Sequence, residues 1–131
     1  MDLKDCIPKD KFDLAAIDRA VEAGFPQINP ILPDLLEWIK DGNWPVALPT
    51  ASLLSGAGPE IIPFVKSILN ADDGMWKYWT IGLVVRPALT KKRMAVQADL
   101  GRLTLNPSQD DLNCDVVEQA KAVLLGLKRA F

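Results

Sequence analysis

Apolar residues recur at helical spacing along most of this chain, and that spacing limits the fold more than any other feature. Leu32, Leu35, Leu36 and Ile39 form one such stripe. Sustained alternation of apolar and polar residues, the pattern of a half-buried strand, is missing. The sequence therefore predicts an all-α fold. The expected helices cover residues 12–23, 30–40, 44–55, 59–70, 74–85, 89–105 and 115 to near the C-terminus.

Asparagine and proline mark where several of these helices begin. Asn29 and Asn43 are expected to cap the helices that follow them. Pro33, Pro49 and Pro63 each lie three or four residues inside an expected helix. Proline beyond the first turn removes a backbone hydrogen bond and costs about 3 kcal/mol. We therefore expect either a later start or an irregular, 3₁₀-like first turn in each of these three helices.

Two stretches of the chain resemble each other. The matched pieces are Ile31-Leu32-Pro33 with Leu35-Leu36-Glu37-Trp38-Ile39, and Ile61-Ile62-Pro63 with Val65-Lys66-Ser67-Ile68-Leu69. An acidic turn and a Trp follow each piece. Repeated helix pairs predict stacked antiparallel pairs in a short α-solenoid of the HEAT or armadillo type. We expect one domain over 1–131, with units at about 29–58, 59–87 and 88–131 and helix 12–23 as an N-terminal cap. An ordinary bundle with accidental similarity is the alternative.

Several short runs also resemble a known family. They are Ile7-Pro8-Lys9-Asp10-Lys11, Leu36-Glu37-Trp38, Asp41-Gly42-Asn43-Trp44-Pro45-Val46-Ala47 and Trp76-Lys77-Tyr78-Trp79. Together they are similar to a bacterial family of domains of unknown function, numbered 5071. The resemblance covers the chain from about Leu3 to the last helix, more loosely in the final third. It implies a small, all-helical, HEAT-like domain and brings no activity with it.

The chain has 131 residues and no histidine, which limits its chemistry. Histidine is the commonest general acid or base and the commonest metal ligand. Its absence excludes Ser-His and Cys-His nucleophilic pairs and mixed Cys/His zinc sites. Two cysteines cannot complete a four-thiolate zinc site. Cys6 and Cys114 are expected to be free thiols, because disulfides are rare in the cytoplasm, where we expect this protein. We expect no enzyme activity, no metal and no cofactor.

The charge balance gives expectations about partners and location. The net charge is −2 and the isoelectric point about 5.1, whereas nucleic-acid binders usually carry a basic excess. No apolar run approaches the roughly 20 residues of a membrane span, and the polar N-terminus does not resemble a signal peptide. We expect a cytoplasmic protein that binds neither nucleic acid nor membrane.

Two motifs supply the candidate binding residues. In the first, Asp41, Asn43 and Trp44 either build a turn and pack between helix pairs, or contact a partner at the rim of a groove. In the second, Trp76, Lys77, Tyr78 and Trp79 belong to a helix that is apolar nearly all round. Such a helix is usually buried, but an open end would place aromatic rings beside a lysine in a binding pocket.

The sequence is compatible with three functions. The favoured one is a non-catalytic interaction module that binds another protein, because repeated helix pairs present an extended surface. The alternative is a small molecule bound in an aromatic pocket built from Trp44 and residues 76–79. An enzyme is less favoured, and its candidate residues would be Asp41, Lys77 and Tyr78.

Overall fold

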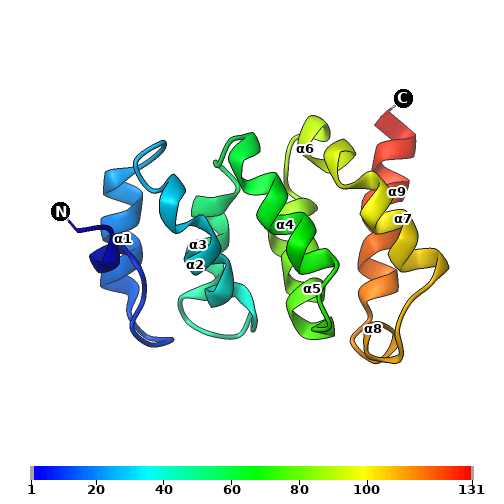
Figure 1. Ribbon diagram of the computed structural model, residues 1–131, viewed down its shortest axis with the longest axis horizontal. Helices are drawn as coiled ribbons and strands as arrows, with labels where there is room; N and C mark the ends of the chain where they lie inside the picture. The colour runs from blue at the N-terminus through cyan, green and yellow to red at the C-terminus, as the bar shows by residue number, and fades with distance from the viewer. Residues whose placement is uncertain (1, 131) are drawn as a thin grey trace.

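The helices of this chain lie side by side in a row, as the computed structural model in Figure 1 shows. Helix α1 occupies one end of the row, and α7 and α9 occupy the other. The structure describes residues 2–130. Every regular element in that range is helical and none is a strand, so the predicted all-α class is confirmed.

The described residues contain nine α-helices and five 3₁₀ or π-helical segments. The α-helices are α1 (Leu14–Ala23), α2 (Leu32–Leu36), α3 (Ala47–Leu54), α4 (Ile62–Leu69), α5 (Gly74–Thr80), α6 (Thr90–Ala95), α7 (Gln97–Leu105), α8 (Gln109–Asn113) and α9 (Val116–Ala130). The 3₁₀ segments are η1 (Leu3–Cys6), η2 (Asn29–Ile31), η3 (Glu37–Ile39) and η4 (Pro59–Ile61), and η5 (Ile81–Val85) is π-helical.

Proline determines how three helices begin. Pro33 and Pro63 are the second residues of α2 and α4, and a 3₁₀ turn precedes each helix. Helix α3 begins at Ala47, later than expected, which leaves Pro49 inside its first turn. The first N–H groups of a helix have no intrahelical acceptor, so proline there removes no helical hydrogen bond. The expectation of irregular or later starts is confirmed at all three positions.

The second half of the chain departs from the expected helices in two places. The helix expected over 89–105 is broken at Val96, which has φ −110° and ψ 10° and separates α6 from α7. The break lets Val96 pack into the core, whereas no residue of α6 is buried. Helix α8 has only five residues, too few for periodicity to reveal it. A Ser108–Asp111 capping box starts it.

The segment formed by α5 and η5 lies at the centre of the row. η5 packs against α3 on one side and against α9 on the other. Its side chains Ile81, Val84 and Val85 are buried in the same apolar core as residues from both neighbours. Among the described residues, no helix combines the length and apolar character needed to cross a membrane.

One glycine permits a close approach between two segments of the row. A Cβ atom at Gly42 would overlap the six-membered ring of Trp79. The loop before α3 therefore comes as close to α5 as a bare backbone allows. Gly101 on α7 offers a contrast, since a Cβ there meets nothing within 4 Å.

We expect the Gly42→Ala substitution to destabilise the fold, because the added methyl group must displace the Trp79 ring. Overpacking of this kind typically costs about 1–3 kcal/mol. Gly101→Ala is the matched control and should gain about 0.5–1 kcal/mol, since alanine favours a helix interior over glycine. Urea unfolding followed by circular dichroism measures both. Equal effects of the two substitutions would contradict this packing argument.

Candidate functional site

The seven residues that the sequence singles out fall in two neighbouring segments. Asp41, Asn43 and Trp44 lie between η3 and α3, whereas Trp76, Lys77, Tyr78 and Trp79 lie on α5. Because the Trp79 ring lies against Gly42, the two segments are in contact. Their side chains nevertheless have different surroundings.

Trp76 contributes to an apolar groove between α2 and α4. The groove has a volume of about 100 Å³. Its lining residues are Pro33, Leu36, Phe64, Ser67, Ile68 and Trp76. The indole N–H of Trp76 donates to the Leu36 carbonyl at 3.0 Å, which fixes the orientation of the ring. The groove therefore presents a half-buried indole whose polar atom is already satisfied.

A lysine covers one face of that indole. Lys40 Nζ lies 4.4 Å from the centroid of the Trp76 ring, within the range of a cation–π interaction. The Glu37 carboxylate is 3.7 Å from the same ammonium group, and the two side chains are 38% (Lys40) and 59% (Glu37) exposed. Glu37 and Lys40 thus form an ion pair beside Trp76, at one end of the groove.

The loop residues Asp41 and Asn43 mainly shape their own turn. Asp41 Oδ1 accepts a hydrogen bond from the Asn43 backbone N–H at 2.8 Å, and the Asp41 carbonyl accepts from the Trp44 N–H at 3.1 Å. The prediction that Asn43 caps the next helix is wrong, because α3 starts after Val46 without a side-chain cap. Trp44 packs against Trp38, with ring centroids 5.7 Å apart.

Lys77 is buried inside the protein and paired with a carboxylate from another helix. Its side chain is about 5% exposed, and its ammonium group lies 2.6 Å from Asp111 Oδ1. Asp111 also accepts the Ser108 backbone N–H at 3.0 Å in the capping box of α8. Next to this pair, the Gly74 N–H at the start of α5 donates to Asp110 Oδ2 at 2.7 Å. These contacts fasten α8 to α5.

The pKa of the Asp111 carboxyl reflects this environment. Burial alone would raise that pKa, but the Lys77 ammonium and the hydrogen bonds from Ser108 outweigh it. The net result is a pKa below the ordinary value of 3.8. Asp111 is therefore held as a carboxylate at neutral pH, and Lys77 is engaged with it rather than with solvent.

Tyr78 and Trp79 form an edge-to-face pair with centroids 4.9 Å apart. Tyr78 also lines an open groove of about 420 Å³ between α5 and α9. The other residues of that groove are Arg86, Asp115, Glu118, Gln119 and Ala122. The Trp79 indole N–H is buried and meets no hydrogen-bond acceptor in the part of the chain that is described. Trp79 thus packs inward while Tyr78 reaches a surface.

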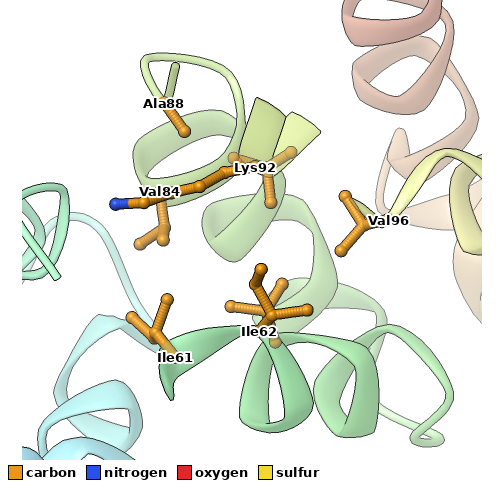
Figure 2. Close-up of a pocket in the computed structure, with 8 residues that line it drawn as sticks. Ile61, Ile62, Val84, Ala88, Lys92 and Val96 are labelled. Carbon is orange, nitrogen blue, oxygen red and sulfur yellow. The ribbon is translucent and has the colours of Figure 1, made fainter. Parts of the chain in front are cut away.

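A third cavity has no room for a ligand. Figure 2 shows the apolar side chains around it, with Lys92 extending away from Val96 and past Val84. The cavity holds about 20 Å³, roughly the space of one water molecule. Lys92 Nζ donates to the carbonyl oxygens of Ser55, at 3.2 Å, and Ala57. This lysine ties α6 to the loop that precedes η4.

Over residues 2–130 no three His, Cys, Asp or Glu side chains are placed to hold a metal ion. No disulfide joins Cys6 and Cys114. Burial, followed by the carboxylate of Asp110, raises the pKa of the Cys114 thiol, which makes that thiol a poorer nucleophile.

Five of the six residues that line the groove, and Lys40 beside it, lie outside the set that the sequence singles out. Lys40 follows Pro33 and Leu36 at helical spacing, so the three share one side of the α2–η3 segment. Phe64 occupies the repeat position that corresponds to Asp34 in the first stretch. A large apolar residue replacing an exposed charge at the same repeat position is the signal that identifies it.

We expect Lys77→Met to destabilise the fold by about 3–5 kcal/mol, because it leaves the Asp111 carboxylate buried without its counter-charge. The double variant Lys77→Met/Asp111→Asn should recover part of that loss. The amide oxygen of Asn keeps an acceptor for the Ser108 N–H and removes the unpaired charge. A double-mutant cycle from urea unfolding measures the coupling. Simple additivity of the two substitutions would contradict the pairing.

The Asp111 carboxylate makes the free energy of unfolding depend on pH in a predictable direction. Because folding lowers the pKa of Asp111, its ionised form stabilises the native state above pH 3.8. That contribution is lost as the pH falls through the lowered pKa. We expect the free energy of unfolding of the Asp111→Asn variant to vary less between neutral and acid pH than that of the unmodified chain. If the unfolding free energies of the two proteins change in parallel with pH, Asp111 contributes nothing to the pH dependence of stability.

Comparison with known proteins identifies a family that this chain matches. A search of curated proteins found no match. The family described as a domain of unknown function, DUF5071, matches residues 6–124. The match includes the α2–α4 groove, the buried Lys77–Asp111 pair and the central helix between them. Since it covers most of the sequence, the chain belongs to the DUF5071 family.

Proposed function

We propose that this protein is a non-catalytic interaction module whose helices stack in pairs as a short, HEAT-like α-solenoid. The repeat in the sequence supports this arrangement. Pro33 and Pro63 occupy the same place in the two copies, just after the 3₁₀ turns η2 and η4. Each copy thus begins with the same turn from a 3₁₀ segment into an α-helix, as expected for repeated units.

The observation that carries the proposal is the groove between α2 and α4. Its floor is formed by Leu36 and Ile68, and the Trp76 ring is held in place by its hydrogen bond to Leu36. An indole with a satisfied N–H offers its apolar surface to a partner at no further polar cost. Preformed apolar grooves between helices are common docking sites for protein segments.

The size of the groove favours one side chain of a protein over a metabolite. Pockets for small molecules typically enclose about 300–1,000 Å³, whereas this groove holds about 100 Å³. The aromatic residues also diverge, since Trp76 lines the groove and Trp79 packs on Gly42. The expected occupant is therefore a large apolar side chain on a partner protein, flanked by polar residues that meet Glu37 and Lys40.

The contacts of the enzyme candidates support a non-catalytic role. Asp41 closes its own turn, Lys77 pairs with Asp111, and Tyr78 lines the separate groove beside α9. A general acid or base must reach the proton that it transfers, and these three groups serve different parts of the fold. We further propose that the module acts in the cytoplasm and binds neither nucleic acid nor membrane.

Selection of peptides from a random display library against the purified protein tests this function. We expect the enriched peptides to share one large apolar residue and to shift the NMR signal of the Trp76 indole N–H. The Ser67→Arg variant places a long charged side chain at the exposed edge of the groove and should weaken binding at least tenfold, a change of about 1.4 kcal/mol.

Ser52→Arg is the matched control for that experiment, because Ser52 is an exposed serine on α3, outside the groove. It should bind the selected peptides as the unmodified protein does. Peptides that bind Ser67→Arg with unchanged affinity would place the docking site elsewhere. A library of metabolites that shifts the same indole signal, with no peptide doing so, would favour the small-molecule alternative.

A further inference from the structure

The two ends of the row each leave one helix face without a neighbour. At the α1 end, the exposed residues Leu14, Asp18, Val21 and Glu22 follow helical spacing and share one side of the helix. The opposite side of α1 holds the buried residues Ala16, Ile17 and Ala20. Val21 is 57% exposed. This end face of α1 therefore combines apolar side chains with two carboxylates.

The other end of the row combines apolar side chains with basic ones. On α9, Lys121, Leu125 and Lys128 are exposed at helical spacing, on the side away from buried Ala120, Val123 and Leu127. On α7, Leu105 is 88% exposed and Gly101 borders open space. A groove of about 410 Å³ lies beside them, lined by Met94, Gln97, Leu124, Leu127 and Lys128.

Opposite charges make these two end faces complementary. Asp18 and Glu22 stand on the α1 face, and Lys121 and Lys128 stand on the α9 face. On α1, the nearest cation is Arg19, which donates to the Asp5 carbonyl at 2.6 Å. On α9, the exposed Glu118 lies one turn before Lys121 on the same side of the helix and also lines the groove beside α5. The α1 face thus carries two carboxylates, whereas the α9 face carries two ammonium groups against one carboxylate and is net basic.

We propose that the occupant of each end face is a second copy of this chain, with the α1 face of one molecule packed on the α7–α9 face of the next. Within one molecule, α1 packs on α3 and η5 packs on α9. A neighbouring α1 laid against α9 would extend the same side-by-side row across the boundary between copies. The exposed leucines and Val21 then become buried, and carboxylates meet ammonium groups.

This contact joins two different surfaces, so it does not close on itself. A head-to-tail interface closes into a ring only if the rotation between copies closes, and an interface that continues the row produces open chains of increasing length rather than a fixed dimer. The charge pairs lie at the surface, so salt weakens their attraction. The interface is separate from the α2–α4 groove, so the proposal does not rest on the function proposed above.

Light scattering coupled to size-exclusion chromatography tests the contact over a range of protein concentrations. In low salt, the mass should rise steadily above the 14.4 kDa of one chain, and added salt should lower it again. Lys121→Glu/Lys128→Glu should remain at the mass of one chain, because its two end faces are then both acidic. Asp18→Lys/Glu22→Lys should do the same, because both of its faces are basic.

Two further samples distinguish an interface from a general effect of charge. A mixture of the two variants should associate again, because the unaltered α1 face of one meets the unaltered α9 face of the other. Arg86→Glu/Lys91→Glu makes the same change in net charge at exposed residues outside both end faces and should associate normally. Ser67→Arg should also associate normally, which separates this contact from the groove.

Three results would overturn the proposal. The unmodified chain could stay at 14.4 kDa at every concentration, which would mean that the end faces do not bind a second copy. The mass could level off at twice that value, which would indicate a closed dimer. The mass could rise equally in both charge-reversal variants, which would place the interface elsewhere.

Discussion

The position of α5 and η5 depends on contacts from three sides. The Trp76 N–H binds the Leu36 carbonyl, the Trp79 ring rests on Gly42, and Lys77 pairs with Asp111. The first contact joins α5 to α2, and the second joins it to the loop before α3. The third contact joins α5 to α8, later in the chain. In a row of helices, elements far apart along the row do not support one another, so the central segment connects the two halves. Its polar contacts specify position, while Ile81 and its neighbours supply the apolar burial.

The period of the apolar residues was enough to predict the class of fold and most helices. It succeeds for α9 because buried residues recur from Val116 to Leu127, and for α4 because Val65, Ile68 and Leu69 are buried at helical spacing. It fails at Val96 because Leu89, Val96, Leu100 and Leu103 keep helical spacing in the sequence, although the backbone breaks at Val96 and Leu89 is exposed. It misses the π-helical geometry of η5 because a run of apolar residues is compatible with either helix type. Short helices such as α8 are better recognised by their caps.

Only part of the candidate site could be predicted from residue types and their spacing in the sequence. The sequence singles out Trp76, because aromatic residues gather around it in a helix that is apolar on several sides. The environment of Lys77 is not predictable in this way, since its partner Asp111 belongs to a distant segment. A spacing rule describes neighbours within one helix and says nothing of neighbours across the fold. Phe64 lines the groove and Lys40 covers the Trp76 ring only because α4 and η3 pack against α5.

The close approach of Gly42 to Trp79 has a consequence for how this family diverges. A side chain at position 42 and an indole at position 79 occupy the same space, so each residue restricts what the other position accepts. Family members should therefore change these positions together, with larger residues at 42 accompanied by smaller ones at 79. The loop and the helix, though distant in sequence, are in this respect a single evolutionary unit. Their joint variation would also show which relatives keep the turn leading into α3.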